Sequence, residues 1–386
     1  MKLGLIGINE IGLSFGLLCE KKGHEVLVSN SNDDYVFNLN QNICITNEPL
    51  IQSMLFDTTK FSATTSNTEV IKNSDIIFIF SPTPSNIDGN YDTTKVFDVV
   101  SEFYSLSSQN FSLYNKKVVI CSTTNPGEVS QIQERLNMFN IQVAYNPFFT
   151  NDGEIVKDIE NHEMVLIGGE YQELINDLIS LHTELKKVLV NVYTMSSKAA
   201  ELTKISINSF LSVKITYANM LGEIITKSGV EDEVDMVLTA IGGDSGIGQK
   251  HMKYGFGYGG PTINGDNKSL KHFANSIDAN TELIASVDTF NKSHISFLKE
   301  YYIQKNPNKE VPFIMNHITY KKGTNVIEES QQFQLCIDLL NEGYTLNVIE
   351  IPEVAEKLTS LSESYDGRLK FFPIGTKPEG YEIKLN

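Results

Sequence analysis

Short apolar runs separated by polar, glycine and proline positions recur through the first half of the chain. Lys2–Ile6 is such a run, and the turn Gly7–Gly12 and a stretch with helical apolar spacing follow it. Glu25–Ser29 is the next apolar run. The order predicts a strand, a turn, a helix and a second strand, which is the βαβ pattern.

The same alternation continues toward the middle of the chain. Further apolar runs predict strands at 75–80, 117–121, 142–145 and 164–167. Strands that are apolar at every position are typical of parallel sheets whose two faces are both covered by helices.

The pattern changes after Met195. From Ser197 to about Lys227 there is no proline, the single glycine is Gly222, and apolar residues recur at helical spacing, which predicts one long helix. Helical patterns follow at about 231–241, 269–275 and 282–302, with a glycine-rich loop at 254–261 between them.

Strand and helix patterns alternate again after Pro307, as a strand at 311–315, a helix at 331–341 and a strand at 346–349. The predicted fold class is α/β, with two Rossmann-like α/β domains joined by a helical domain that contains a long central helix. We place the three domains at residues 1–195, 196–303 and 304–386.

Composition narrows the function classes. The 386 residues include 48 acidic and 31 basic side chains, giving a net charge of −17, which argues against nucleic-acid binding. No apolar run reaches the roughly 18 residues that a membrane helix needs, so we expect a soluble, cytoplasmic protein.

The four cysteines form no CxxC pair, and the histidines form no HxxxH or HExxH pattern. We therefore expect reduced cysteines and no metal site. The chain has only two arginines, Arg135 and Arg368, so phosphates would be held by lysine or by backbone N–H groups.

Gly7, Asn9 and Gly12 occupy the positions of a GxGxxG dinucleotide turn. A helix N-terminus offers N–H groups and positive potential to a pyrophosphate. Asn9 stands where a second glycine would let the backbone approach the phosphates, so its side chain narrows that approach. An alternative interpretation is a βαβ unit that kept its turn and lost its nucleotide.

Asn30 follows the second strand, where an acidic residue normally accepts the ribose hydroxyls. Its amide can still bond to one hydroxyl. Asp33 and Asp34 would repel the 2′-phosphate of NADP, so the predicted cofactor is NAD.

Motifs distributed over nearly the whole chain match those of one enzyme family. They are Glu48-Pro49, Ser81–Pro84 with Asp88-Gly89, Ser122-Thr123 with Pro126-Gly127, Tyr145–Phe149, Ala200–Lys204 with Asn208–Phe210 and Lys214, Gly242–Asp244 with Ile247-Gly248, Gly255–Gly260 with Asp266 and Leu270, and Tyr320-Lys321 with Thr324, Glu329 and Ser330. In these motifs the chain resembles the UDP-glucose/GDP-mannose dehydrogenase family.

The resemblance implies oxidation of a nucleotide-sugar 6-hydroxyl to a carboxylate while two NAD are reduced. It implies an NAD-binding domain at 1–195, a helical domain at 196–303 that forms a homodimer through the long helix, and a nucleotide-sugar domain at 304–386. A UDP-sugar is the expected substrate, in polysaccharide biosynthesis, with neither nucleic acid nor membrane as a partner.

The resemblance also implies the site residues. Those for the cofactor are Gly7, Asn9, Glu10, Ile11, Gly12, Asn30, Pro82, Thr83 and Thr123. Those for the substrate are Phe148, Phe149, Thr150, Lys204, Asn208, Tyr254, Phe256, Gly257, Tyr258, Gly259, Gly260 and Lys321.

The family's first oxidation uses a lysine, an asparagine, a threonine and an aspartate around an ordered water. These match Lys204, Asn208, Thr123 and Asp266. Lys204 and Asn208 are four residues apart, so one face of a helix presents both. A buried lysine can stabilise the alkoxide that develops on the sugar.

Two residues of the family's second oxidation are replaced. Thr262 stands at the position of the cysteine that forms a thioester, and Phe148 stands at that of the glutamate that assists its hydrolysis. Three basic positions of the family are also lost, at Gly246, Gly265 and Glu328.

The sequence thus favours an NAD-dependent nucleotide-sugar 6-dehydrogenase that transfers a hydride without the covalent thioester step. The product would be an aldehyde or its hydrate, and full oxidation through the hydrate is conceivable. One alternative is a catalytically inactive or regulatory nucleotide-sugar-binding homologue. Another is a reaction of the wider β-hydroxyacid and 6-phosphogluconate dehydrogenase group.

Overall fold

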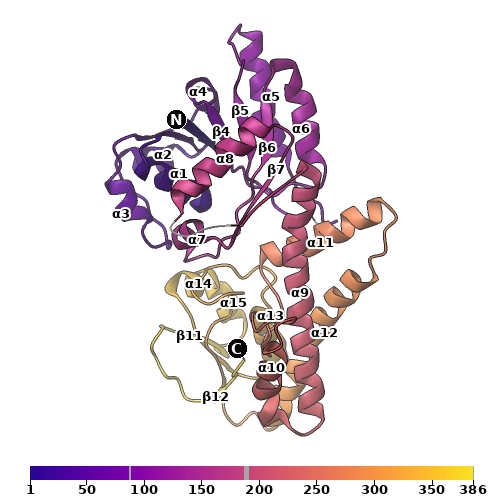
Figure 1. Ribbon diagram of the computed structural model, residues 1–386. Helices are drawn as coiled ribbons and strands as arrows, with labels where there is room; N and C mark the ends of the chain where they lie inside the picture. Colours follow the sequence, from indigo (N-terminus) through magenta and orange to yellow (C-terminus); the bar gives the residue numbers. More distant parts are fainter. Residues whose placement is uncertain (87, 187–190, 386) are drawn as a thin grey trace. The chain divides into compact units, whose positions relative to one another are not determined.

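The computed structural model describes residues 1–86, 88–186 and 191–385, which form two compact units. The first unit comprises residues 1–204 and the second residues 205–386. The helix α9 (Ser197–Lys227) is continuous over 31 residues and contributes to both units (Figure 1). Its bounds are those that the sequence predicts, and the division into three domains stays a prediction.

The first unit is built on an eight-stranded sheet with the order β3-β2-β1-β4-β5-β6-β7-β8. Its strands are β1 (Lys2–Ile6), β2 (Glu25–Ser29), β3 (Phe61–Thr64), β4 (Ile76–Ile79), β5 (Lys117–Ile120), β6 (Gln142–Tyr145), β7 (Met164–Gly169) and β8 (Asn191–Met195).

The expectation of a purely parallel sheet is wrong at one place. Strands β1 to β6 are parallel to their neighbours, but β7 pairs antiparallel with β6, with Tyr145 opposite Gly168. The connection 146–163 therefore does not cross the sheet, and β7 begins at the edge where β6 ends. Strand β8 then runs parallel to β7.

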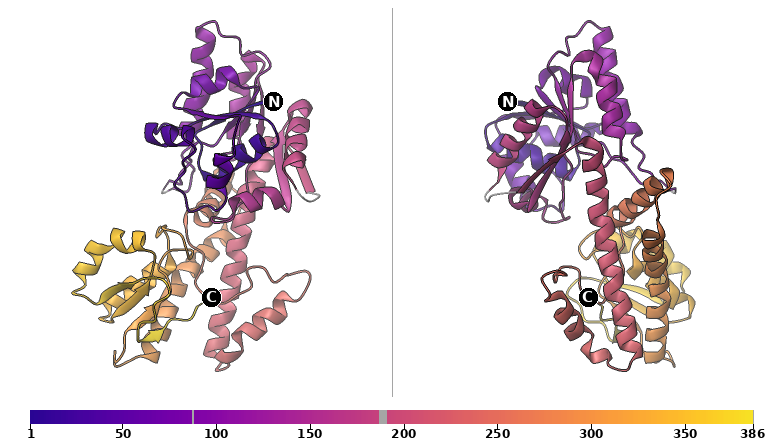
Figure 2. Two further views of the ribbon diagram at one scale, coloured as in Figure 1. Left: turned by 90° about the vertical axis from the view of Figure 1, so that its left-hand side faces the viewer. Right: turned by 45° about the vertical axis from the view of Figure 1, so that its right-hand side comes forward.

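Helices cover both faces of this sheet (Figures 1 and 2). They are α1 (Glu10–Lys21), α2 (Asp33–Asn40), α3 (Ile51–Phe56), α4 (Asn67–Asn73), α5 (Thr94–Ser108), α6 (Glu128–Leu136) with the 3-10 turn Asn137–Phe139, α7 (Ile155–Asn161) and α8 (Gln172–Leu185).

Two hydrophobic cores result, one on each face of the sheet. Helices α1, α2, α3, α7 and α8 share one core, and α4, α5 and α6 share the other. In β4, Ile76 and Phe78 enter the first core while Ile77 and Ile79 enter the second. This alternation explains why an all-apolar run is a strand here.

The second unit contains a smaller, parallel sheet with the order β11-β10-β9-β12. Its strands are β9 (Phe313–Met315), β10 (Leu346–Ile349), β11 (Leu369–Phe372) and β12 (Tyr381–Glu382). Its helices after α9 are α10 (Val234–Gly242), preceded by the 3-10 turn Glu231–Glu233, α11 (Pro261–Ser276), α12 (Glu282–Lys305), α13 (Gln331–Asn341), α14 (Pro352–Lys357) and α15 (Thr359–Ser364).

Helix α11 begins at Pro261 and not near Ser269 as predicted. Gly260 has φ +75° and ends the preceding loop, and the fixed φ of a proline suits the first helical position. The helix therefore carries Thr262 and Asp266 on its first turns, ahead of the start predicted near Ser269. Together with the two sheets and α9, this confirms the predicted fold class.

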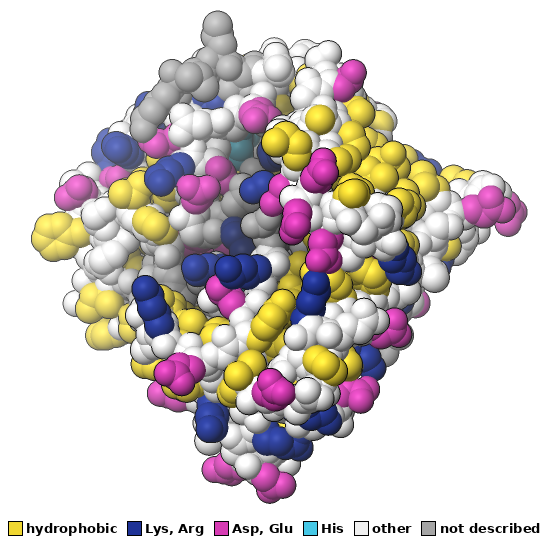
Figure 3. Space-filling view, turned by 90° about the horizontal axis from the view of Figure 1, so that it is seen from below, with side chains coloured by type: hydrophobic (Ala, Val, Ile, Leu, Met, Phe, Trp, Pro, Cys, Tyr) yellow, Lys and Arg dark blue, Asp and Glu magenta, His cyan; other side chains and the backbone are white. Residues whose placement is uncertain are grey.

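The surface carries charges of both signs. On the face drawn in Figure 3, basic and acidic side chains are interspersed with exposed hydrophobic ones. In the part of the chain that the structure describes, no helix is long and apolar enough to cross a membrane.

Candidate functional site

The turn after β1 needs its two outer glycines for space. Gly7 has φ +68°, and a Cβ there would lie 2.8 Å from Ser81 Oγ and 2.9 Å from its Cα. A Cβ on Gly12 would lie 2.9 Å from the ring of Phe80. These contacts place α1 and the turn directly against the segment that follows β4.

Asn9 has a definite role in this turn. It is the N-cap residue of α1, and its Oδ1 accepts a hydrogen bond from the backbone N–H of Gly12 at 3.0 Å. The N–H groups of Glu10 and Ile11 lie in the first helical turn, which has no intrahelical acceptors for them. The turn therefore presents free backbone donors at a helix N-terminus, as a dinucleotide site requires, and the contacts of Glu10 and Ile11 with a cofactor stay a prediction.

Asn30 lies beside the same turn, but its amide bonds to the chain itself. Its Nδ2 donates to the Ile8 carbonyl at 2.9 Å, and its Oδ1 accepts from the Asn32 N–H at 2.9 Å. Its predicted contact with a ribose would replace one of these bonds.

The loops that follow β4 and β5 are tied together at the carboxyl edge of the sheet. Ser122 Oγ donates to the Ser81 carbonyl at 2.7 Å. Asn125 exchanges two hydrogen bonds with the backbone of Tyr91, both of 2.9 Å. Pro82, Thr83 and Thr123 lie in these loops, so the structure brings three predicted cofactor residues to the edge where Gly7 ends β1.

Glu201 is a residue of this site that the sequence reasoning missed. It is fully buried, and its carboxylate accepts from Thr124 Oγ1 at 2.8 Å, Gly127 N at 2.6 Å and Val129 N at 3.0 Å. Burial raises its pKa to about 7, because the desolvation cost exceeds the gain from these bonds. The only sequence feature that could have indicated a role for Glu201 in the site is its position three residues before Lys204.

The segment 145–150 has two differently placed phenylalanines. Phe149 lies under Lys204, whose Nζ is 5.6 Å from the ring centroid. Phe148 instead belongs to the hydrophobic core, with its ring centroid 5.1 Å from that of Phe15 and 5.7 Å from that of Phe80. The ring packs against α1 because an apolar ring is more stable there than in water, and its assignment as a substrate residue stays a prediction. Thr150 follows at the half-buried end of the segment.

Two buried histidines lie beside Phe148. His182 is 3% exposed, and its Nε2 is 2.7 Å from Asn146 Oδ1. Asn146 Nδ2 donates to the Leu166 carbonyl, so its oxygen must accept from His182. Burial lowers the pKa of His182 to about 3 and that of His162 to about 4.

In the second unit, α9 and α11 join two predicted catalytic residues. Asn208 Nδ2 donates to Asp266 Oδ2 at 2.6 Å, and Asp266 is fully buried. The next residues of both helices also bond, Ser209 Oγ to Asn267 Oδ1 at 2.8 Å. Lys204, which is 6% exposed, precedes Asn208 by one helical turn on α9.

Thr262 is exposed on the first turn of α11. The four cysteines, Cys19, Cys44, Cys121 and Cys336, are buried, and burial raises the pKa of each thiol. A thiolate nucleophile is therefore strongly disfavoured at each of them at neutral pH.

The glycine-rich loop 254–260 is closely packed against its own unit. A Cβ on Gly257 would lie 2.0 Å from Asn291 Oδ1, and one on Gly260 would lie 2.5 Å from the ring of Tyr320. Tyr258 is 3% exposed, while Tyr254 and Phe256 are partly buried. The loop thus lies beside the turn that carries Lys321.

Gly259 is equally confined, since a Cβ there would lie 2.7 Å from the Glu329 carbonyl. The Lys321 carbonyl accepts from the hydroxyls of Thr319 and Thr324, which closes the neighbouring turn. Among the described residues, no group of three or more His, Cys, Asp or Glu side chains could hold a metal ion.

Family models match most of the chain. The NAD-binding domain of the UDP-glucose/GDP-mannose dehydrogenase family matches residues 1–186, and the central domain of that family matches residues 198–293.

Curated relatives agree with this match. The chain is 25% identical over 301 residues to UDP-glucose 6-dehydrogenase YwqF of Bacillus subtilis (strain 168), covering 77% of this chain and 67% of that protein. It is 24% identical over 362 residues to GDP-mannose 6-dehydrogenase of Azotobacter vinelandii, covering 91% and 81%.

Solved structures show the same fold. A UDP-glucose dehydrogenase from Pyrobaculum islandicum superposes with a TM-score of 0.84 at 22% identity, over 96% of this chain and 85% of the other. A UDP-D-ManNAc dehydrogenase from Pyrococcus horikoshii gives 0.77 at 18% identity, over 99% and 98%. The chain belongs to the UDP-glucose/GDP-mannose dehydrogenase family, and its N-terminal domain is the NAD-binding domain of that family.

Proposed function

We propose that this protein oxidises a hydroxyl of a nucleotide sugar, a UDP-sugar in first place, by hydride transfer to NAD and without a covalent thioester intermediate. The observation that carries the proposal is the bond between Asn208 and the buried carboxylate of Asp266. NAD accepts the hydride when bound. The chain's own task is to remove the hydroxyl proton and to stabilise the charge that develops.

Three residues support that task. Asp266 can accept the proton through an ordered water, and Asn208 holds one of its oxygens in place. Lys204 supplies a positive charge at a largely dehydrated position, where it stabilises an alkoxide better than it would in water. We assign Thr123, on the loop fixed by Glu201, to the ordered water.

The absence of a usable thiol supports a two-electron reaction. Thr262 is a poor nucleophile, because an unactivated hydroxyl attacks far less readily than a thiolate, and the buried cysteines hold protonated thiols. Phe148 lies in the core and cannot activate a water. We therefore expect an aldehyde or its hydrate as the product.

A specific observation favours the second candidate, a nucleotide-sugar-binding protein without catalysis. The Gly12 N–H donates to Asn9 Oδ1, and the Asn30 amide bonds to the backbone of Ile8 and Asn32. The Gly12 N–H and the Asn30 amide, which would contact a dinucleotide, therefore have intramolecular partners. That protein would bind the sugar nucleotide and would bind NAD weakly.

A homodimer through α9 is part of the proposal. Phe210, Tyr217 and Ile224 follow one another at intervals of seven residues on α9, and their exposed fractions are 66%, 48% and 54%. Large apolar side chains at this spacing form a stripe suited to a second helix. Sedimentation of the wild type and of a Phe210→Glu/Ile224→Glu variant tests it, since the variant should be a monomer.

The decisive experiment measures NADH absorbance with purified protein, NAD⁺ and a panel of UDP- and GDP-sugars. We expect about one NADH per sugar oxidised, and a loss of at least roughly 100-fold in rate for Lys204→Ala. Two NADH per sugar together with a trapped thioester would contradict the proposal. No NADH and no thermal shift with NAD⁺, but a shift with a UDP-sugar, would establish the second candidate.

A further inference from the structure

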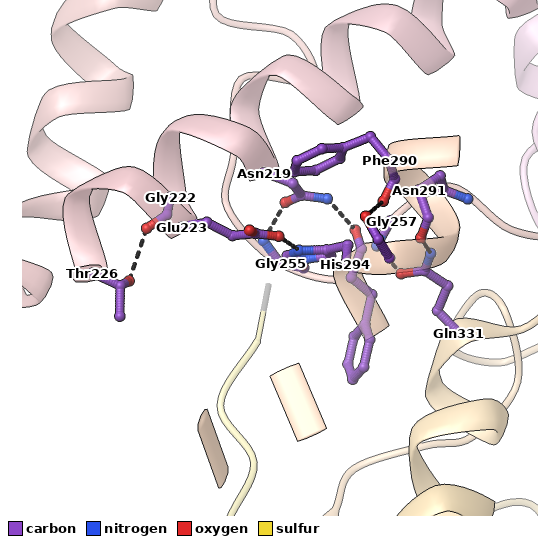
Figure 4. A network of polar contacts seen from close by, with 12 residues as sticks. Asn219, Gly222, Glu223, Thr226, Gly255, Gly257, Phe290, Asn291, His294 and Gln331 are labelled. Atoms are coloured by element: carbon purple, nitrogen blue, oxygen red, sulfur yellow. Dashed lines mark hydrogen bonds and ion pairs between the residues drawn. The ribbon is translucent and has the colours of Figure 1, made fainter. Parts of the chain in front are cut away.

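The glycine-rich loop 254–260 is anchored through its backbone by side chains from three helices. Figure 4 shows this network, in which α9, α12 and α13 each contribute. Asn219 accepts from Gly255 N at 3.0 Å and donates to the Phe256 carbonyl at 3.3 Å. Asn291 donates to the Tyr258 carbonyl at 3.0 Å.

Gln331 completes the set from α13. Its Oε1 accepts from Gly257 N, and its Nε2 donates to the Asn291 carbonyl at 2.6 Å. Backbone groups of four consecutive loop residues, 255 to 258, are thus bonded to side chains far away in sequence. A ligand on this loop must bind to the backbone and side-chain groups of the loop that these bonds do not use. The orientation of those groups depends on the anchoring side chains.

His294 on α12 is the central anchor, and its ring is fully buried. Its Nδ1 is 2.7 Å from Glu223 Oε1, and its Nε2 is 2.8 Å from the Gly255 carbonyl oxygen. The Gly255 carbonyl oxygen can only accept, so Nε2 carries a hydrogen, and an ionised Glu223 requires a hydrogen on Nδ1 as well. A ring with both hydrogens is an imidazolium, whose charge the Glu223 carboxylate balances.

Aromatic rings fix the plane of this imidazole. Phe290 and Phe297 lie nearly parallel to it, with centroids at 6.1 and 6.2 Å. The ring of Tyr254 meets it edge-on at 6.0 Å. Gly222 of α9 leaves room for Tyr254, because a Cβ there would lie 1.9 Å from the Tyr254 ring. The ring can therefore point its two N–H groups only at Glu223 and Gly255.

We propose that His294 and Glu223 form a charged positioning pair that holds the 254–260 loop in the conformation that binds the nucleotide sugar. This proposal rests on the proposed function, since it assigns the ligand of the loop from it. The pair contacts the loop backbone and not the reacting atoms, so it acts on substrate affinity and leaves the chemical step largely unchanged.

The first test reads the state of the ring without any ligand. The chain has seven histidines, so ¹⁵N-histidine labelling gives a countable spectrum, and the His294→Gln variant assigns the resonance. We expect both ring nitrogens of His294 to show imidazolium shifts at neutral pH. The shift pattern of a neutral tautomer would overturn the charged pair.

The second test reads the loop. Tyr254, Phe256 and Tyr258 are chymotrypsin sites, so a loosened loop should be cut faster. We expect His294→Gln to speed cleavage there and to weaken UDP-glucose binding in calorimetry, each by roughly tenfold, with kcat within a few-fold. The matched control is Lys292→Gln, which removes an exposed cation from the same helix and should change neither quantity.

The double variant Glu223→Gln/His294→Gln separates charge from packing. It should bind UDP-glucose better than His294→Gln alone, because the single variant leaves the partly buried carboxylate of Glu223 without its cation. Equal rates of loop cleavage in the wild type and His294→Gln would overturn the proposal that His294 anchors the loop. If the wild type fails to bind UDP-glucose or any other UDP- or GDP-sugar while the spectrum and cleavage are as expected, the anchor stands and the proposed function fails.

Discussion

Helix α9 carries a buried or largely buried glutamate in each unit, and the two are satisfied in opposite ways. Glu201 in the first unit accepts from one hydroxyl and two backbone N–H groups, all within the segment 124–129, which runs from a loop into the first turn of α6. Glu223 in the second unit accepts from the ring of His294. Glu201 thereby fastens the loop of Thr123 in the first unit, and Glu223 acts through His294 on the glycine-rich loop in the second unit.

The difference shows that the partners of a buried carboxyl group decide its behaviour. Neutral dipoles leave much of the desolvation cost of Glu201 unrelieved, which is why its pKa is raised to about 7. Glu223 instead has a single side-chain partner, His294 at 2.7 Å, so each group of the pair depends on the other. The first loop should therefore respond to pH, and the second to the loss of either partner.

The largest expected effect is that of Glu223→Ala. It leaves the buried His294 cation without its counter-charge, which costs about 3–5 kcal/mol for a buried pair. Urea unfolding followed by hydrogen exchange in residues 205–385 would measure it. The control is Glu184→Ala, which breaks a His–Glu pair whose Glu184 side chain is 44% exposed, and should cost under about 1 kcal/mol. Equal costs for both variants would refute the contrast.

The next effect is a pH dependence located at Glu201. Its folded-state pKa of about 7 lies above its ordinary value of 4.5, so its stabilising contribution is complete below pH 4.5 and is lost as the pH rises through 7. The loss amounts to roughly 3 kcal/mol. Stability of the wild type relative to Glu201→Gln should fall by that amount between pH 4.5 and 8, and a constant difference would show that Glu201 does not titrate there.

His182 predicts a dependence of the opposite sign in the same unit. Its folded-state pKa of about 3 lies below its ordinary value of 6.5, so its contribution is complete above pH 6.5 and is lost as the pH falls toward 3. By pH 5 the loss is about 2 kcal/mol. His182→Gln, compared with the wild type in urea unfolding at pH 7 and pH 5, should lose less stability on acidification; an identical loss would contradict the assignment.

The smallest expected effect on stability is at Asn9. Replacing an N-cap asparagine by glycine costs only a few tenths of a kcal/mol, but Asn9→Gly releases the Gly12 N–H for a phosphate oxygen. We expect NAD⁺ to bind roughly tenfold tighter in calorimetry. Asn32→Gly removes the cap of α2 and serves as a control. Unchanged NAD⁺ affinity in Asn9→Gly would mean that the cap does not compete with the cofactor.

Much of the fold follows from local patterns. Apolar spacing was enough to delimit the strands β1, β2 and β6 and the whole of α9, because each is bounded by residues that end an element. The reversal of β7 could not, since strand direction depends on where a connection travels and not on the residues in the strand.

The candidate site likewise contains residues that the sequence could predict and residues that it could not. Asn208 and Asp266 were predictable as a pair from the resemblance, and the structure places them 2.6 Å apart. The bonding roles of Glu201 and His294 were not predictable, because their partners lie more than 35 residues away and are mostly backbone groups, which the position of Glu201 in its motif does not reveal. The packing of Phe148 against α1 could not be predicted, because a motif position says which residue is present but not which way its side chain points.

Phe148 and Thr262 replace two residues of the family's second oxidation, and they differ in how much of the structure must change to restore the family residue. Thr262 is exposed on the first helical turn of α11, so a cysteine would fit there without repacking and would gain from the helix N-terminus. A glutamate at position 148 would have to enter a core of aromatic rings. A cysteine at position 262 thus needs one exposed substitution, whereas a glutamate at position 148 requires compensating changes in α1 and its neighbours.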